Sequence, residues 1–148
     1  MNDIIKSALS NSELQRKGTV LTLPDKQSKN ANVLIVDDSR TSRKILRGIL
    51  EGAGHEIVAE AVDGLDGVNK YKEFSPQVVT MDITMPIMDG LEALKTIKEE
   101  NKDAKVIMVT AAGQQNKMMD AIKLGASEFV TKPFDADNIL KMVDKLTR

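Results

Sequence analysis

Three aspartates, a threonine and a lysine stand where short apolar runs of this sequence end. Asp37 and Asp38 follow directly on one such run, and Asp82 follows directly on another. Thr110 comes directly after a third run, and Lys132 stands two residues after a fourth. Two adjacent carboxylates repel each other, so a cation between them would stabilise the pair. These residue types therefore allow a Mg²⁺ site with a hydroxyl and an ammonium group nearby.

Each of these residues also has an ordinary structural interpretation. Asp38 or Ser39 could cap a following helix, since both residue types favour that position. Asp82 could be a turn residue, Thr110 a β-branched strand residue, and Lys132 a solvated surface lysine. From the two adjacent acids alone, a helix cap and a metal site are equally supported. The decision depends on which elements bring the other residues to the same place.

Length and composition indicate a globular protein with one main domain. The chain has 148 residues, of which 41% are hydrophobic and 29% charged, enough for one core and a short appendage. The formal charge of −1 gives no general attraction for nucleic acid or for an anionic membrane. The sequence has no cysteine, which excludes disulfides and thiolate chemistry, and its single histidine, His55, is predicted at the surface.

No targeting or membrane segment is predicted. No apolar run approaches the roughly 20 residues of a membrane-spanning helix. The N-terminus has no basic segment followed by an apolar stretch, as a secretory signal would. A cytoplasmic protein is therefore expected.

From residue 32 onward, short apolar segments alternate with segments of helical periodicity. The expected strands are Asn32–Val36, Glu56–Ala61, Gln77–Met81, Lys105–Val109 and Ser127–Val130. The expected helices are Ser39–Glu51, Gly64–Phe74, Gly90–Glu100, Gln114–Leu124 and Asp135–Leu146. Each helix has an apolar stripe that we assign to the core, and Ile45, Leu65 and Ile122 belong to these stripes.

This alternation predicts an α/β fold in which a doubly wound, five-stranded parallel sheet carries helices on both faces. The first, third and fourth strands are the most continuously apolar and should be central. That favours the flavodoxin-like strand order 2-1-3-4-5 in a three-layer sandwich. Residues 1–31 are predicted to be a separate N-terminal extension, with a short helix over Asp3–Lys17, a weak strand over Thr19–Leu23 and a polar linker.

In such a sheet the carboxyl ends of the strands meet at one edge, where ligands bind. Three acids, a hydroxyl and a lysine would then share a crevice, a coincidence that single-residue explanations do not account for. Asp82 could attack phosphorus as a nucleophile and form an acyl phosphate. A metal held by the acids and the ammonium group of Lys132 would neutralise the transferring group. Its new oxygens would attract the hydroxyl of Thr110 and move the loop that follows.

The combination of Asp37-Asp38, Asp82, Thr110 and Lys132-Pro133 resembles the receiver domain of bacterial two-component response regulators. The stretch from Asp82 to Gly90 (DITMPIMDG) fits the same family, and the resemblance covers residues 32–148. It implies that Asp82 accepts a phosphoryl group from a histidine kinase. It also implies no enzymatic activity beyond the chain's own phosphorylation and dephosphorylation.

The resemblance further assigns roles to individual residues. Mg²⁺, or alternatively Mn²⁺, would be held by Asp37, Asp38 and Asp82 together with the main-chain carbonyl of Thr84. Lys132 would contact the phosphoryl group and would precede a cis peptide bond to Pro133. Thr110 would be the switch hydroxyl. Phe129 corresponds to the family's switch aromatic, although an ordinary core position in its strand is equally supported.

Within the family, the stretch Thr110–Gln115 and the end of the chain after the fifth helix are most similar to stand-alone, CheY-type chemotaxis regulators. This implies a monomer with a CheA-like histidine kinase as donor and a flagellar motor switch protein, or another target, as partner. The target would bind the face of the fourth helix, fifth strand and fifth helix, near Met118, Met119 and Lys123. A separate phosphatase is a further possible partner. The alternative is a receiver in another phosphorelay or a developmental pathway.

Two other protein classes share parts of this pattern. A phosphatase of the haloacid dehalogenase type also uses an aspartate at a strand end, but it needs an acid two residues later, where this sequence has Thr84. An FMN carrier of the same architecture needs a phosphate-binding loop after the first strand, where Asp37 and Asp38 would repel a phosphate. Both classes are disfavoured.

Overall fold

The computed structural model describes residues 30–148, and its central feature is a five-stranded parallel sheet. The strands are β1 (Asn32–Val36), β2 (Glu56–Ala61), β3 (Val78–Asp82), β4 (Val106–Thr110) and β5 (Glu128–Thr131). The helices are α1 (Arg40–Gly52), α2 (Gly64–Phe74), α3 (Gly90–Glu100), α4 (Gln115–Lys123) and α5 (Ala136–Leu146). The strand order is β2-β1-β3-β4-β5, which confirms the predicted topology. The helix and strand predicted within residues 1–29 lie outside the described residues.

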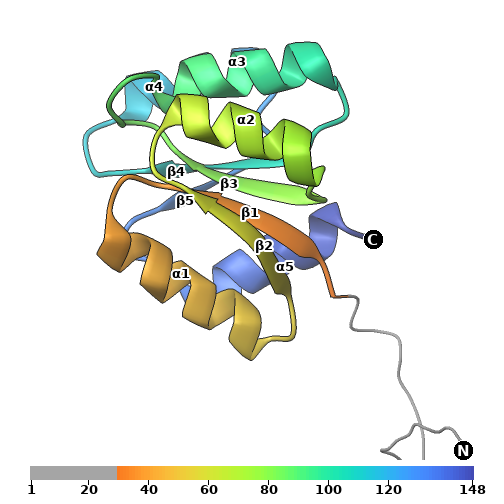
Figure 1. Ribbon diagram of the computed structural model, residues 1–148. Coiled ribbons are helices and arrows are strands. Elements are labelled where there is room, and N and C mark those ends of the chain that lie inside the picture. The colour runs from red at the N-terminus through yellow and green to blue at the C-terminus, as the bar shows by residue number, and fades with distance from the viewer. Residues whose placement is uncertain (1–29) are drawn as a thin grey trace, which may run out of the picture.

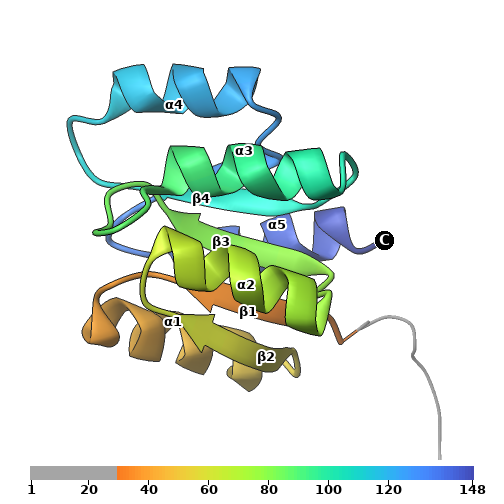
Figure 2. The same ribbon diagram turned by 45° about the horizontal axis from the view of Figure 1, so that its top comes forward.

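Helices cover both faces of the sheet, so the strands are buried from two sides (Figures 1 and 2). Because successive side chains of a strand alternate between faces, β1 contributes Leu34 and Val36 to one core layer and Val33 and Ile35 to the other. The first layer lies under α2, α3 and α4, and the second lies under α1 and α5. Fully burying each such side chain contributes about 1.5–3 kcal/mol.

The last three strands begin and end one residue later than predicted. Asp82, Thr110 and Thr131 are therefore the final residues of β3, β4 and β5. The ladder continues through them because it depends on backbone groups: the N–H of Ile83 still donates to the carbonyl of Val109 at 3.2 Å. Polar side chains thus extend the strands to the edge where the acids lie.

The start of each helix explains most of the other boundary differences. α1, α4 and α5 begin one residue after the predicted position, because Ser39, Gln114 and Asp135 are their N-cap residues. Side chains cap the N-termini of α1, α2, α3 and α5, each accepting a hydrogen bond from a backbone N–H of the first turn. Gln114 makes no such bond to α4. Among the five described helices, α4 alone lacks a side-chain cap.

Three residues predicted in the core are exposed. Ile45, Leu65 and Ile122 are 50%, 45% and 50% exposed, whereas Leu46 and Ala121 are buried. Adjacent helical residues point about 100° apart, so the burial of Leu46 turns Ile45 outward, and the burial of Ala121 does the same to Ile122. Leu65 lies in the first turn of α2. The stripe that each helix buries is narrower than the apolar pattern suggests.

His55, predicted at the surface, is half-buried where the chain enters β2. Its Nδ1 accepts a hydrogen bond from the backbone N–H of Ala31 at 3.0 Å. Burial lowers the pKa of His55, and the negative charge of Asp144 opposes that change in part. His55 therefore supports the N-terminal end of the sheet, opposite the edge where the acids lie.

Gly90 fixes how closely α3 approaches the end of β3. A Cβ atom added there would lie 2.0 Å from the carbonyl oxygen of Asp82. The N–H of Gly90 also donates to the carbonyl of Ile83 at 2.7 Å. Only glycine fits this contact, which lets the start of α3 pack directly against the backbone of Asp82.

Within residues 30–148, each helix is too short or too polar to cross a lipid bilayer.

Candidate functional site

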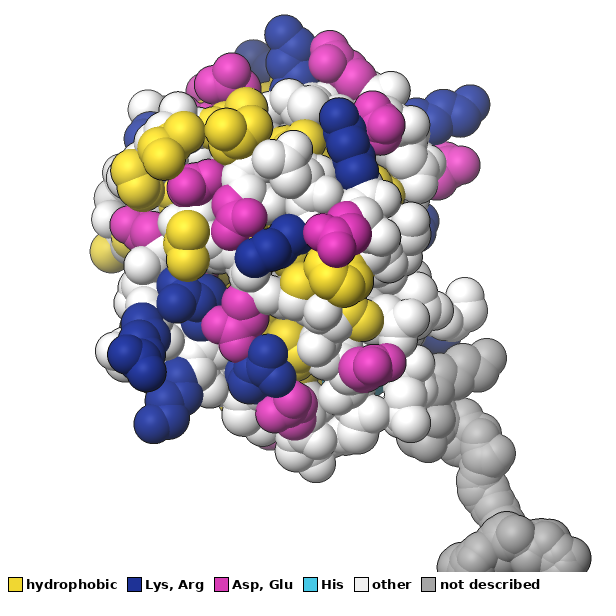
Figure 3. All heavy atoms as spheres, in the orientation of Figure 1, with side chains coloured by type: hydrophobic (Ala, Val, Ile, Leu, Met, Phe, Trp, Pro, Cys, Tyr) yellow, Lys and Arg dark blue, Asp and Glu magenta, His cyan; other side chains and the backbone are white. Residues whose placement is uncertain are grey.

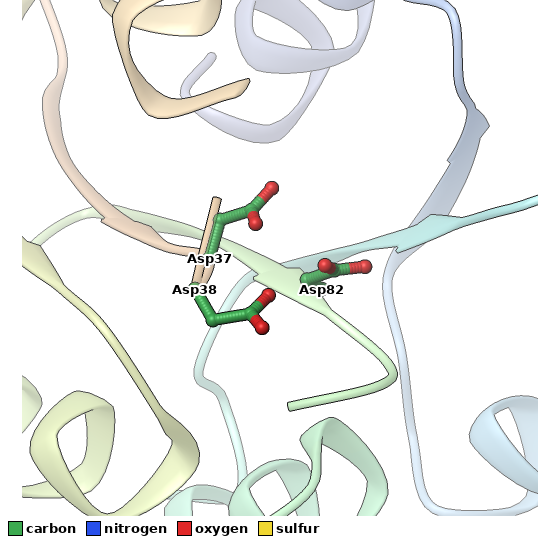
Figure 4. A group of neighbouring side chains, drawn as sticks. All are labelled: Asp37, Asp38 and Asp82. Carbon is green, nitrogen blue, oxygen red and sulfur yellow. The ribbon is translucent and has the colours of Figure 1, made fainter. Parts of the chain in front are cut away.

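The ends of β1 and β3 bring the three aspartates together. Asp37 and Asp38 follow β1 directly, and Asp82 is the last residue of β3, the strand paired beside it. In Figure 4, the side chains of Asp37 and Asp38 extend from the end of β1 toward Asp82 at the end of β3. One carboxylate oxygen from each residue lies within 4.8 Å of those of the other two. Asp37 and Asp82 are buried and Asp38 is exposed, so the cluster opens to solvent on one side.

Asp37 is held on all sides by hydrogen bonds and an ion pair. Its Oδ1 accepts from the N–H of Ser39 at 2.8 Å, and its Oδ2 lies 3.0 Å from Nζ of Lys132. Its main-chain carbonyl accepts from Nη1 of Arg43 at 2.8 Å, and Arg43 is itself paired with Glu60 at 2.9 Å. These contacts fix the orientation of Asp37 before any ligand binds.

Of the two residues that could cap α1, Ser39 does so and Asp38 does not. Ser39 is the N-cap residue, and its Oγ accepts from the N–H of Ser42 at 3.2 Å. Because Ser39 satisfies the helix start, the Asp38 carboxylate is free to face the other acids. Of the two explanations for the adjacent acids, the structure favours the metal site.

Lys132 reaches the acids from the end of β5, the edge strand on the other side of β4. Its Nζ lies 3.0 Å from Oδ2 of Asp37 and 3.4 Å from Oδ2 of Asp82. Burial opposes its positive charge, but the two carboxylates outweigh that effect and raise the pKa of Lys132. The Lys132–Pro133 peptide bond is cis, as predicted. Lys132 is therefore charged at neutral pH and is placed to contact any anionic group on Asp82.

The protonation of Asp82 depends on its surroundings. Burial, followed by repulsion from Asp37, raises the pKa of Asp82 to about 6, although Lys132 lowers it in part. The positive charge of Lys132 thus offsets only part of the burial and repulsion that disfavour ionised Asp82. A cation bound among the acids would stabilise the ionised form of Asp82.

The donor set fits a small, hard divalent cation. Carboxylate oxygens are the ligands that Mg²⁺ prefers, and Mg²⁺ takes few of them because it keeps several waters. Asp37, Asp38 and Asp82 meet this requirement and would also accept Mn²⁺. Thr84 lies in the β3–α3 loop beside them, and the role of its main-chain carbonyl stays a prediction.

Thr110 and Phe129 lie on the same face of the sheet. Phe129 pairs with Met108 across β4 and β5, and Met108 and Thr110 share a face because they are two residues apart. Thr110 is buried, and its Oγ1 donates to the carbonyl of Val130 at 3.5 Å. Phe129 is half-buried against the core layer under α2, α3 and α4. The structure brings the two residues into adjoining positions, and their coupled switching stays a prediction.

Two residues of the site were missed by reasoning from sequence. Gln114 joins the β3–α3 and β4–α4 loops through its side-chain amide: Nε2 donates to Oγ1 of Thr84 at 2.7 Å, and Oε1 accepts from the N–H of Ala111 at 2.7 Å. Arg43 holds the carbonyl of Asp37. One signal in the sequence could have indicated Gln114. It stands four residues after Thr110 at the start of a predicted helix, and glutamine is rarely an N-cap residue. Arg43 has the usual sequence appearance of a surface residue on a helix.

The surface beside the crevice is part apolar and part basic. The exposed apolar residues Val62, Leu65 and Ile87 belong to the segments that enter α2 and α3. The exposed basic residues Arg40 and Lys44 belong to α1. Figure 3 shows yellow side chains gathered near the starts of α2 and α3, and blue ones near the start of α1.

Comparisons with known proteins agree with this geometry. The chemotaxis protein CheY of Bacillus subtilis is 51% identical over 113 residues, which are 76% of this chain and 94% of that protein. CheY of Thermotoga maritima is 44% identical over 116 residues, or 78% of this chain and 97% of that protein. A solved chain in the CheX–CheY–BeF₃–Mg²⁺ complex from Borrelia burgdorferi has a TM-score of 0.75 and 41% identity, covering 79% of this chain and 89% of that one.

The family model for the response regulator receiver domain matches residues 33–144, which include every site residue described above. The fold, the strand order and the acid cluster are those expected from that resemblance. The chain belongs to the response regulator receiver domain family.

Proposed function

We propose that this chain is a CheY-type response regulator that accepts a phosphoryl group on Asp82 from a histidine kinase and then binds a target in chemotaxis. The observation that carries the proposal is the position of Asp82. Its buried carboxylate lies beside two further acids and 3.4 Å from the ammonium group of Lys132. A nucleophile, a site for a divalent cation and a fixed positive charge thus share one crevice.

In the proposed reaction, a carboxylate oxygen of Asp82 attacks the phosphorus of a phosphohistidine. The O–P bond forms as the P–N bond breaks, and the imidazole leaves. Asp37 holds Lys132 in place, and Lys132 contacts a phosphoryl oxygen. Arg43 and Ser39 keep Asp37 oriented. Mg²⁺, bound by Asp37, Asp38 and Asp82, would supply charge neutralisation for the transferring group. The chain itself would act as substrate and switch, without a separate enzymatic activity.

The proposed target surface is formed by α4, β5 and α5. Met119 is 57% exposed on α4, and Lys123 is exposed near its end. Lys145 of α5 pairs with Glu128 of β5 at 2.6 Å, so these two elements present one continuous face. The names of the similar proteins support chemotaxis as the pathway. We propose a CheA-like kinase as donor and a flagellar motor switch protein as target. We place the protein in the cytoplasm as a monomer.

The first test is phosphorylation by acetyl phosphate in Mg²⁺. Wild-type protein should acquire one phosphoryl group, detectable as a mass increase and released by alkali and by hydroxylamine as an acyl phosphate is. Asp82→Asn should lose at least about 100-fold in labelling because the amide is not a nucleophile. Removal of Mg²⁺ with EDTA should abolish labelling of the wild type. Asp103→Asn is the matched control, because Asp103 is exposed in the turn between α3 and β4.

Labelling of Asp82→Asn at the wild-type rate would contradict the assignment of the acceptor. Equal labelling with and without EDTA would contradict the metal requirement. The pathway is tested separately, by measuring whether the phosphorylated form binds a motor switch protein more tightly than the unmodified form. Equal binding of the two forms would remove that protein as the target.

A further inference from the structure

The side-chain amide of Gln114 connects two loops at the mouth of the crevice. Its Nε2 donates to Oγ1 of Thr84, and its Oε1 accepts from the N–H of Ala111, each at 2.7 Å. Thr84 follows β3, and Ala111 follows β4, so the amide bridges segments about thirty residues apart in sequence. Both bonds are short for an N–H···O geometry. Gln114 therefore joins the β4–α4 loop to the β3–α3 loop, which directly follows Asp82.

The N–H of Ala111 faces the side of β4 on which Asp82 lies. In a parallel ladder, alternate residues direct their backbone groups to opposite neighbours. The carbonyl of Val109 accepts from Ile83 on the β3 side, and the carbonyl of Thr110 accepts from Lys132 on the β5 side. Ala111 continues this alternation and turns its N–H back toward β3. Since Asp82 is paired with Val109, that N–H is directed to the crevice.

We propose that Gln114 is a positioning residue that latches the β4–α4 loop in the unphosphorylated conformation. Its Oε1 occupies the Ala111 N–H, a donor that oxygens of a phosphoryl group on Asp82 would otherwise accept. Phosphorylation then displaces the Gln114 amide from Ala111. This inference rests on the proposed function of Asp82 and adds a competitor for the new anion.

The position of Gln114 explains how its release would reach α4. Gln114 is the N-cap residue of α4, yet its side chain gives no hydrogen bond to that helix. The helix start is therefore held through the same amide that spans the crevice. α4 has only Ala121 fully buried, so its first turn has little other anchorage. When the amide leaves Ala111, the start of α4 keeps only the single bond from Nε2 of Gln114 to Thr84 in the β3–α3 loop.

The test measures binding of beryllofluoride, an anion that imitates the phosphoryl group, by calorimetry in saturating Mg²⁺. Gln114→Ala removes the competitor and should tighten beryllofluoride binding about 2- to 10-fold, the range of one net hydrogen bond. The affinity for Mg²⁺ alone is measured for each variant so that Mg²⁺ stays saturating, because Gln114 contacts Thr84, whose main-chain carbonyl is a predicted ligand. Gln114→Met keeps the chain length without the amide and should behave like Gln114→Ala. Thr84→Val removes only the bond from Nε2 of Gln114 to the Thr84 hydroxyl. It should tighten beryllofluoride binding by a smaller factor.

Gln115→Ala is the matched control, since Gln115 is the exposed neighbour and makes no side-chain hydrogen bond within residues 30–148. Its beryllofluoride affinity should equal that of the wild type. If the wild type binds beryllofluoride and both Gln114 variants bind it equally or more weakly, the latch is wrong and the proposed function stands. If the wild type does not bind beryllofluoride in Mg²⁺, the proposed function fails and the latch fails with it.

Discussion

Helices α1 and α4 both begin at the crevice edge, yet they are attached to the sheet in different ways. α1 has 13 residues, a side-chain cap at Ser39, and two buried leucines, Leu46 and Leu50. Arg43 also joins it to the main chain of Asp37. α4 has 9 residues and no side-chain cap, and Ala121 is its only buried residue. One helix is fixed by two buried leucines and a side-chain cap, whereas the other has one buried alanine and a side-chain amide that bonds to the neighbouring loops.

This difference separates the chemistry from the response. The acids and the elements that position them, β1 and β3 with α1, α2 and α3, form what we call the acid side. The remaining elements at the crevice, β4, α4 and β5, form the α4 side. Precise placement of Asp82 needs rigid support, whereas a segment that changes position needs low local stability. The unequal burial of α1 and α4 meets both needs within one small domain.

Glycine substitutions give the largest expected contrast between the two sides. Gly90→Ala should cost about 3 kcal/mol of stability, because its Cβ would meet the backbone of Asp82 at 2.0 Å. Gly113→Ala should cost only about 1 kcal/mol: its φ of +89° is unfavourable for alanine, but nothing lies within 4 Å of the new Cβ. Urea unfolding followed by circular dichroism measures both changes.

Gly48→Ala is the control for this comparison. Gly48 lies inside α1 with open space around a new Cβ, so alanine should raise the stability by about 0.5–1 kcal/mol. An equal loss of stability in Gly90→Ala and Gly113→Ala would mean that the two sides are packed alike. That result would remove the basis for assigning rigidity to the acid side.

The sequence was sufficient to predict the strands, their order and the polar residues at their ends, but not the side-chain contacts between separate elements. Val33–Val36 is apolar on both faces and ends at two acids, so its burial, its central place and its chemistry follow from one short stretch. The N-cap residues of α2 and α3, Asp63 and Asp89, are also typical of their positions. These features depend on local patterns, which a single sequence contains.

The missed features depend on contacts between distant residues. The bond from Gln114 to Thr84 joins two loops, and no pattern of spacing specifies which partner a side-chain amide selects. The same holds for Arg43, which contacts the carbonyl of Asp37 and the side chain of Glu60 on another element. Ile45 was assigned to the core because hydrophobicity alone does not give the width of the buried stripe.

Thr80→Val gives a smaller expected effect, on the acid side. Thr80 lies on β3 two residues before Asp82 and is 2% exposed. Its Oγ1 has no hydrogen-bond partner among residues 30–148, and its strand neighbours are Ile35 and Ile107. A buried hydroxyl without a partner is unfavourable, so valine should raise the free energy of unfolding by about 1 kcal/mol. Urea unfolding of both proteins at pH 7 measures the difference.

Phosphorylation by acetyl phosphate is the control in this case, because the apolar substitution leaves Asp82 and its contacts in place. A loss of stability of similar size would show that the Thr80 hydroxyl is bonded in solution. The acid side would then depend on a buried polar contact rather than on apolar packing alone.

The smallest expected effect concerns the start of β1 and β2, at the end of the sheet remote from the crevice. Burial lowers the pKa of His55 below its ordinary 6.5, so between the two values the unfolded chain binds more protons than the folded one. The contribution of His55 is therefore complete above pH 6.5 and is lost as the pH falls through the lower, folded value.

His55→Asn tests this pH dependence. The asparagine keeps an acceptor for the backbone N–H of Ala31 but does not titrate. Urea unfolding between pH 8 and pH 5 should show the wild type losing more stability than His55→Asn, because all other titrating groups are common to both. A constant difference between the two proteins over this range would mean that His55 is protonated equally in the folded and unfolded chains, and that the support of β2 does not depend on its neutral form.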